Sequence, residues 1–283
     1  MWENIVLIGT LCVLTFLLKN ICSAKPNIIK FYFNFFIFYF LSSIVSLLIF
    51  PLCLLYPKNV KNVNTVTKIM KHITKIYDLK WDLRNGHILS EERGAIIISN
   101  HQSTLDVLGM FNVWDVVGKM TVIAKKEVFY VWPFGLAAYF AGVIFIDRRD
   151  AKAAYKTLDN VASEIMIKNK TKVWLFPEGT RNKDRTKLLP FKKGAFIMAV
   201  RAQVPIIPVL FSPYYFINSK KYTFNRGHVN INCLEAISTV GLTVDDVPDL
   251  IDRVHDLMQR AYAELSKEVM TVIVTIYLYP TVG

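Results

Sequence analysis

Three consecutive isoleucines, Ile96 to Ile98, begin the stretch that most constrains how this chain can fold. They follow Gly94 and lead directly into the polar sequence Ser-Asn-His-Gln-Ser-Thr at 99–104. A short apolar run bounded by glycine and by polar residues is typical of a strand buried on both faces of a sheet. Apolar residues resume a helical spacing from Leu105 onward. The chain is therefore expected to leave a buried strand through a polar turn and to enter a helix.

Two titratable side chains flank this turn. His101 and Asp106 are five positions apart, so on one continuous helix they would diverge by about 140°. If the helix begins near Ser103, His101 lies in the turn before it and Asp106 in its first turn. Such an entry brings the carboxylate to the imidazole, where it would fix the ring and stabilise its protonated form. The alternative is a Ser/Asp helix cap beside an unrelated surface histidine.

Apolar segments alternate with helical segments from Gly94 onward. Strands are predicted at 95–99, 121–124, 143–146, 172–176, 205–210 and 228–234, and helices at 104–112, 132–139, 152–168, 193–201 and 244–267. This alternation predicts an α/β domain whose mainly buried β-sheet is flanked by helices. No internal repeat, low-complexity tract or Gly/Ser linker divides this region. Residues 58–283 are therefore expected to form one domain.

Two apolar runs precede that domain, at Ile5–Leu18 and Phe31–Tyr56, in a chain of 283 residues of which 53% are hydrophobic. The second run is long enough to span a bilayer, and the first is marginal. Residues 1–57 are predicted to form a membrane-anchoring hydrophobic hairpin that either spans the bilayer or dips into it. A cleaved signal peptide is disfavoured because Met1–Asn4 contains no basic residue and a second apolar run follows.

The charge of the chain favours anionic partners. The formal net charge is +12, which suits phospholipid surfaces and phosphorylated substrates. Nucleic acid is disfavoured because the lysines are dispersed and no recognised binding module is present. Lysines concentrated after Tyr56 place the following domain on the cytoplasmic side by the positive-inside rule. Residues 66–77 are predicted to form an amphipathic helix, either on a membrane or on the body of the protein. The four cysteines do not form a disulfide framework.

Cationic residues stand at the ends of two further predicted strands and at the start of one predicted helix. Arg148 and Arg149 leave one strand, the turn Pro177–Arg181 leaves another, and Lys192 and Lys193 open a helix. Guanidinium groups and helix N-termini both suit phosphate recognition. In open α/β sheets, ligands bind beyond the carboxyl ends of the strands. A phosphate site near His101 is therefore expected.

Four segments, NHQSTLD, GVIFIDR, FPEGTR and VPIIPV, occur in this order. They resemble the four sequence blocks of the glycerolipid acyltransferases, and the likeness is strongest to the 1-acyl-sn-glycerol-3-phosphate acyltransferases of the alpha and beta type. It covers about Met1 to Ser266. The resemblance implies a glycerolipid-acyltransferase-like fold and transfer of an acyl chain from acyl-CoA to the sn-2 hydroxyl of lysophosphatidic acid, giving phosphatidic acid. It also implies acyl-CoA as co-substrate without a resident cofactor, membrane lipids as partners, and the endoplasmic reticulum membrane with a cytosolic catalytic domain at 58–283.

The resemblance implies a role for individual residues. His101 would be the general base and Asp106 its orienting partner. Substrate-binding roles fall on Glu178, Gly179, Thr180 and Arg181 at the acceptor phosphate, on Arg148, Lys192 and Lys193 as further phosphate contacts, and on Lys125 as a headgroup contact or a surface lysine. Val204–Pro208 would shape an acyl-binding wall. The aromatic run Phe129–Phe134 would line an acyl channel, pack in the core or anchor at a membrane interface.

Several alternative functions stay open or are disfavoured. The acceptor could instead be glycerol 3-phosphate or another lysophospholipid. A membrane-bound lipid hydrolase of the serine type is disfavoured because no Gly-x-Ser-x-Gly elbow is present, and a metal site because the other histidines lie far apart in the sequence. A non-catalytic membrane scaffold would leave the four segments unexplained. The apolar tail after Ser266 is interpreted as an added strand or a membrane-surface contact.

Overall fold

Seven strands form one sheet in the order β1-β9-β6-β2-β5-β3-β4 in the computed structural model, which describes residues 2–23, 25–59, 62–147, 149, 157–158 and 160–278. The strands are β1 (Leu79–Arg84), β2 (Ala95–Ser99), β3 (Met120–Lys125), β4 (Ile144–Ile146), β5 (Lys172–Leu175), β6 (Ile206–Phe211) and β9 (Gly227–Cys233). A separate two-stranded ladder joins β7 (Ile217–Asn218) to β8 (Thr223–Phe224). All pairings in the large sheet are parallel except that of β6 with β9. The six predicted strands are therefore confirmed, and β1 is an additional strand.

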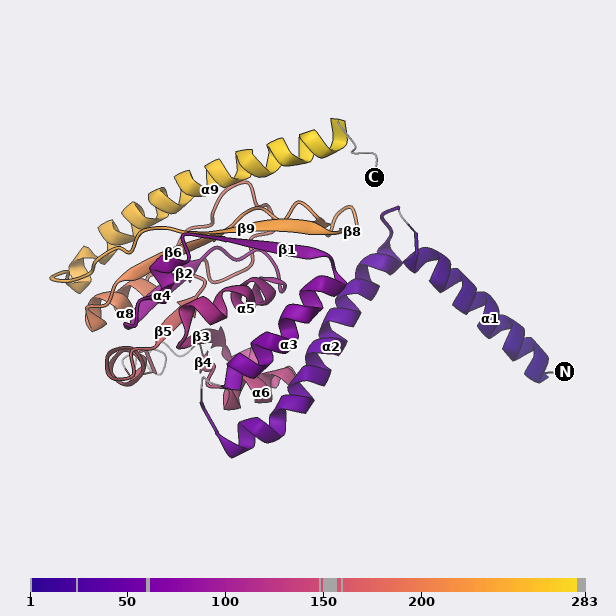
Figure 1. The fold of residues 1–283 in the computed structure, drawn as a ribbon, viewed down its shortest axis with the longest axis horizontal. Helices are drawn as coiled ribbons and strands as arrows, with labels where there is room; N and C mark the ends of the chain where they lie inside the picture. The colour runs from indigo at the N-terminus through magenta and orange to yellow at the C-terminus, as the bar shows by residue number, and fades with distance from the viewer. Residues whose placement is uncertain are drawn as a thin grey trace.

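Helices cover both faces of this sheet (Figure 1). They are α1 (Trp2–Ile21), α2 (Ile28–Leu55), α3 (Asn62–Ile76), α4 (His87–Ser90), α5 (Asp106–Val117), α6 (Phe134–Phe140), α8 (Gly194–Ala202) and α9 (Val247–Leu278). Two 3-10 helices are η1 (Lys126–Tyr130) and η3 (Val244–Asp246), and η2 (Val161–Lys168) is a π-helix. Of the helix predicted at 152–168, residues 152–156 and 159 lie outside the described residues, and 161–168 form the π-helix η2.

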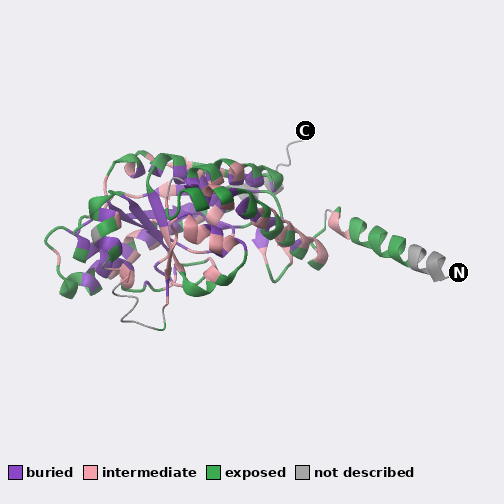
Figure 2. Cartoon of the chain, turned by 90° about the horizontal axis from the view of Figure 1, so that it is seen from below, coloured by how far each residue is buried: buried purple, intermediate pink, exposed green. Residues whose placement is uncertain are grey.

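The isoleucine run explains why the sheet is covered on both faces. Side chains alternate between the two faces of a strand, and Ile97 joins one core cluster with residues of α2, α3 and α5. Ile96 and Ile98 join a second cluster with residues of η2, α8 and α9. All three are completely buried, and the central strands are coloured as buried in Figure 2. The α/β prediction is confirmed.

Helix α2 lies along the body of the protein rather than apart from it. Its buried side, which includes Phe38 and Ile49, belongs to the first core cluster, and the helix packs against α3 and α6. Its opposite side exposes large apolar residues: Tyr32, Phe36, Tyr39, Phe40, Leu47 and Leu48. Among the described helices, α2 is long and apolar enough to cross a membrane. Helix α1 extends away from the body, as Figure 1 shows. The domain boundary at residue 57 stays a prediction.

The amphipathic helix predicted over 66–77 is α3. Its apolar side, with Met70 and Ile73, is buried between α2 and α5. Packing on the body therefore accounts for this pattern, as in the second of the two sequence interpretations.

The C-terminal tail is a helix, so the interpretation as an added strand is wrong. Helix α9 continues past Ser266 as far as Leu278. Leu265 and Val269, four positions apart, are both buried, and the guanidinium of Arg84 donates two hydrogen bonds of 2.7 and 2.6 Å to Glu268. Extending a helix that is already formed adds one hydrogen bond per residue, which outweighs the β preference of the β-branched residues in the tail.

Candidate active site

The carboxyl ends of four parallel strands carry the predicted site residues to one edge of the sheet. His101 follows β2, the turn Pro177–Arg181 follows β5, Lys125 ends β3, and Asp147 follows β4. A cavity of about 840 Å³ opens at this edge, and His101, Lys125 and Arg181 all line it. Of the cations expected near His101, Arg181 and Lys192 therefore line the same cavity as this histidine, whereas Arg149 lines a separate pocket.

His101 and Asp106 form a hydrogen-bonded pair. The distance between His101 Nδ1 and Asp106 Oδ2 is 2.6 Å. Helix α5 begins at Asp106 itself, so the predicted start near Ser103 is three residues early. The bent entry is nonetheless present and allows a pairing that a continuous helix would forbid. With Nδ1 donating to the carboxylate, Nε2 is the ring nitrogen left to accept a proton.

Asp106 is held by its own turn. Its side chain is 1% exposed, and its carboxylate accepts the backbone N–H groups of Gln102 at 2.7 Å and Ser103 at 3.1 Å. A buried carboxylate without such donors would be strongly disfavoured. These bonds fix the carboxylate before any substrate binds, and through it they fix the imidazole.

The imidazole is also held by an aromatic ring. The ring of Phe176, at the end of β5, stacks on that of His101 with a centroid distance of 4.1 Å and an interplanar angle of 15°. The His101 side chain remains 23% exposed and lines the cavity. The ring is therefore restrained on one face and accessible to a ligand.

Two amides anchor the turn to the end of β6. The side chain of Asn100 donates to the backbone carbonyl of Phe211 at 3.0 Å and accepts the N–H of the same residue at 2.8 Å. Gln102 donates to the carbonyls of Phe211 and Ser212 and accepts the N–H of Tyr214 at 3.1 Å. Both amides are buried. They take the place of strand pairing where the chain leaves the sheet.

Glu178 links the two central motifs. Its carboxylate accepts the backbone N–H of His101 at 2.8 Å and that of Leu189 at 3.1 Å. Burial raises the pKa of Glu178 above its ordinary value, and the two backbone donors oppose that rise. The side chain is 2% exposed. Through these two hydrogen bonds, Glu178 holds the loop of His101 and the loop of Leu189 together, and we call this arrangement the Glu178 brace. Contact of Glu178 with substrate stays a prediction.

The cavity lining combines polar and apolar residues. Gly179, Thr180, Arg181 and Lys192 line it near His101. Gly179 has a φ of +72°, a conformation that glycine adopts readily and that turns the chain sharply after Glu178. The remaining lining is mostly aliphatic: Val122, Ile123, Ala124, Val128, Ile146, Leu158 and Leu175. One space can therefore hold both an anionic headgroup and an acyl chain.

Comparison with known proteins agrees with this geometry. A sequence-family model described as Acyltransferase matches residues 80–212. The chain is 41% identical over 211 residues to 1-acyl-sn-glycerol-3-phosphate acyltransferase beta of Homo sapiens, a match that covers 74% of each chain. It is 37% identical over 254 residues to the alpha protein of Homo sapiens, which covers 89% of this chain and 88% of that protein. The chain belongs to the 1-acyl-sn-glycerol-3-phosphate acyltransferase family.

A solved structure shares the fold. The crystal structure of the 1-acyl-sn-glycerophosphate acyltransferase PlsC from Thermotoga maritima superposes with a TM-score of 0.64 at 24% sequence identity. The match covers 84% of this chain and 95% of that one. The sheet with its flanking helices is thus the acyltransferase fold.

The remaining predicted residues of this acyltransferase occupy different places. Lys125 and Lys192 are exposed and line the cavity, whereas Lys193 caps α8 and is not among the lining residues. Arg148 lies outside the described residues. Val204–Pro208 leads into β6, and its apolar residues are buried in the sheet and its core. The aromatic run Phe129–Phe134 contributes no residue to the cavity lining, although its neighbour Val128 does. Tyr130 and Trp132, within the run, are exposed.

Sequence reasoning missed the residues that support the His101–Asp106 pair. Phe176, Asn100 and Gln102 all lie within the recognised motifs, but their contacts are made across the sheet. Their position directly after a buried strand was the one available signal. Among the residues that the structure describes, no three His, Cys, Asp or Glu side chains gather as a metal-binding group. The expectation of a metal-free site stays a prediction.

Proposed function

We propose that this acyltransferase transfers an acyl chain from acyl-CoA to the free sn-2 hydroxyl of lysophosphatidic acid, giving phosphatidic acid, with His101 as general base. The observation that carries the proposal is the His101–Asp106 pair at a cavity that also contains Arg181 and an aliphatic lining. The relatives named for this activity match most of the chain, and they support lysophosphatidic acid as the acceptor.

The proposed reaction is a direct transfer. His101 Nε2 removes the proton of the acceptor hydroxyl while its oxygen forms a bond to the thioester carbon. The carbon–sulfur bond then breaks, and the CoA thiolate leaves with the electron pair. Asp106, which accepts from Nδ1, stabilises the imidazolium that forms. The proton then passes to solvent or to the thiolate. General-base assistance of this kind is typically worth about 10²–10⁴-fold in rate.

The serines beside His101 are poorly suited to act as nucleophiles. The hydroxyl oxygen of Ser103 accepts the N–H of Leu105 at 3.2 Å, and that of Ser99 donates to the carbonyl of Asn100 at 3.3 Å. Both side chains are buried, and the paired oxygen of each is engaged in the turn. A covalent acyl-enzyme, which a hydrolase of the serine class requires, therefore receives little support.

Substrate placement is proposed from the two kinds of residue that line the cavity. We assign the acceptor phosphate to Arg181 and Thr180, with Lys125 and Lys192 as further cationic contacts, and the acyl chain to the aliphatic lining. A guanidinium can hold a phosphate through two parallel hydrogen bonds. Holding both substrates beside one base supplies the orientation on which a bimolecular transfer depends.

We place the enzyme at the endoplasmic reticulum membrane with its catalytic domain in the cytosol. The exposed apolar side of α2 and the lysines that follow it support this orientation. Protease added to sealed microsomes should then digest the region beyond Lys58. Protection of that region until detergent is added would contradict the orientation.

The decisive experiment combines purified protein, labelled acyl-CoA and a panel of acceptors. We expect labelled phosphatidic acid from lysophosphatidic acid and much slower transfer to glycerol 3-phosphate and to lysophosphatidylcholine. His101→Ala should lower kcat about 10²–10⁴-fold with little change in KM. Without an acceptor, the denatured protein should carry no label. A stoichiometric acylated residue that is chased into phosphatidic acid would refute direct transfer, and release of free fatty acid without transfer would favour a hydrolase.

A further inference from the structure

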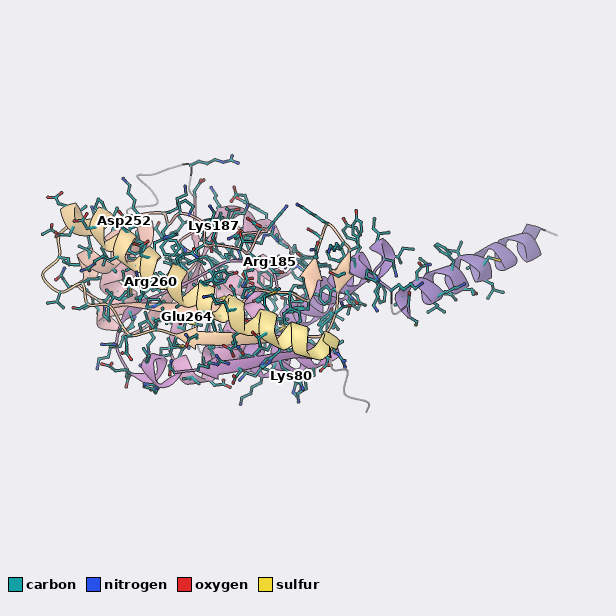
Figure 3. The ribbon with its side chains drawn as sticks, turned by 90° about the horizontal axis from the view of Figure 1, so that it is seen from above. Lys80, Arg185, Lys187, Asp252, Arg260 and Glu264 are labelled. Carbon is teal, nitrogen blue, oxygen red and sulfur yellow. The ribbon has the colours of Figure 1, made fainter. Side chains whose placement is uncertain are left out.

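Arg185 is a half-buried cation close to the His101–Asp106 pair. It lies in the loop between β5 and α8, beside α9, and is labelled in Figure 3. Its Nη1 donates to the backbone carbonyl of Tyr214 at 2.6 Å and to that of Ile217. The hydroxyl of Tyr262, on α9, donates to the Arg185 carbonyl at 2.8 Å. The side chain thus ties its own loop to the segment that follows β6.

The backbone at Arg185 is in an unfavourable conformation for its residue type. Its φ is +61°, in the left-handed region that non-glycine residues rarely adopt. Such a conformation persists where the surrounding contacts enforce it, and it is often associated with function. Here the side-chain and backbone hydrogen bonds of Arg185 supply that enforcement.

The same segment contacts the catalytic turn. Tyr214, whose carbonyl Arg185 holds, donates its N–H to Gln102. Gln102 in turn donates its own N–H to Asp106 at 2.7 Å. A continuous chain of hydrogen-bonded groups therefore connects Arg185 with the carboxylate of the catalytic pair.

Electrostatics links the two residues as well. Burial lowers the pKa of Arg185, and the negative charge of Asp106 is the largest influence opposing that fall. The phenol of Tyr214 is buried between them: its pKa is raised well above the ordinary value, first by burial and then by the Asp106 charge. Arg185 Nε finds no hydrogen-bond partner among the described residues.

We propose that Arg185 is a positioning residue for His101 and Asp106: it clamps the 214–217 segment next to the catalytic turn, and its half-buried charge stabilises the Asp106 carboxylate and opposes protonation of His101. This inference rests on the proposed general-base role of His101. Arg185 is not among the residues that line the cavity, so we assign its effect to Asp106 rather than to direct contact with substrate.

Other ionisable groups also surround Asp106, and they set the background for a test by pH. They are His101 in the same turn, Glu178 after β5, Tyr214 after β6 and Tyr262 on α9. Arg185, in the loop between β5 and α8, contributes a positive charge that acts on Asp106. Removing it should make the imidazolium form of His101 more stable, so neutral base would be present only at higher pH.

The experiment measures the pH dependence of kcat/KM for lysophosphatidic acid, since this ratio reports ionisations of the free enzyme. In Arg185→Gln, the acidic limb should move upward by about 0.5–1 pH unit, as expected for loss of one nearby, partly screened charge. Arg185→Lys restores the charge without the planar fork, so the limb should return to the wild-type position while kcat stays below the wild-type value. Lys187→Gln removes an exposed charge from the same loop and should leave the limb in place.

Each outcome decides the inference. A lower kcat in Arg185→Gln with an unmoved limb would mean a purely structural role and would overturn it. An equal shift in Lys187→Gln would overturn it too, because burial would then be irrelevant. If thermal unfolding shows that Arg185→Gln is not folded, Arg185→Lys decides: a shifted limb or an unchanged kcat contradicts the proposal. An inactive wild-type protein would overturn the proposed function itself.

Discussion

The carboxylate of Glu178 accepts the backbone N–H of His101, with a nitrogen–oxygen distance of 2.8 Å. The residue that follows β5 therefore positions the residue that follows β2. This bond joins two sequence motifs that are separated by more than 70 positions, and it places the brace directly at the candidate base. The position of His101 consequently depends on β5 as well as on its own turn.

Glu178→Ala should weaken both stability and activity. It leaves the N–H groups of His101 and Leu189 without their acceptors, and each buried donor left unpaired costs about 1–3 kcal/mol of unfolding free energy. We expect a lower unfolding temperature in detergent and a lower kcat. The matched control is Glu264→Ala, an exposed glutamate on α9, which should change neither. Equal behaviour of the two variants would show that the brace is unimportant.

Glu178 should also make stability depend on pH. Because burial raises its pKa in the folded protein, the folded state holds the proton more tightly than the unfolded chain, where the pKa is about 4.3. Stability from this group is thus present at low pH and is lost as pH rises through the raised value. Glu178→Gln cannot titrate. The unfolding temperature of wild type relative to this variant should fall as the pH rises above about 4.3, and a constant difference would contradict the argument.

Arg181→Ala should impair acceptor binding selectively. Loss of a charge-assisted contact to phosphate costs about 1.5–3 kcal/mol, so KM for lysophosphatidic acid should rise about ten- to a hundredfold while KM for acyl-CoA changes little. Lys193→Ala serves as the control because Lys193 is not among the cavity-lining residues. Steady-state kinetics with each substrate varied in turn measures both constants. Equal increases for the two substrates would remove Arg181 from the acceptor site.

Phe176 should support catalysis through the orientation of the imidazole. Replacing it by Leu removes the ring that stacks on His101, an interaction worth about 0.5–1.5 kcal/mol, which corresponds to a loss of roughly two- to tenfold in kcat. Phe176→Tyr keeps the stacked ring and should retain most of the activity. A wild-type kcat in Phe176→Leu would show that the turn alone orients the ring.

The exposed side of α2 should bind lipid. Phe36 and Phe40 are 60% and 50% exposed and stack on each other at 5.8 Å. Burying a phenylalanine side chain is worth about 1.5–3 kcal/mol, so the double change Phe36→Asn and Phe40→Asn should weaken flotation with phospholipid vesicles at least tenfold. The unfolding temperature in detergent should stay near the wild-type value, since both side chains lie away from the core. Unchanged flotation would place the membrane contact elsewhere.

The amino-acid sequence by itself determined the strand-turn-helix around His101 and the edge of the sheet on which the site lies. Both follow from short-range rules: an isoleucine run bounded by glycine and polar residues forms a buried strand, and parallel strands bring their carboxyl ends together. The pairing of His101 with Asp106 spans five residues, so it too was accessible from local geometry. The exact start of α5 was not, because the donors that fix Asp106 belong to the turn.

Only the tertiary structure decided which side chains support that pair. The Glu178 brace, the Phe176 ring and the bonds of Gln102 to the end of β6 join residues that lie far apart in the chain. Arg185 belongs to the same class: its sequence context is an ordinary polar loop, yet its hydrogen bonds to Tyr214, Ile217 and Tyr262 hold it half-buried beside the site. The physical reason is that desolvation, stacking and charge interactions depend on which surfaces the folded sheet and helices bring together, and residue spacing within a single segment carries no record of that.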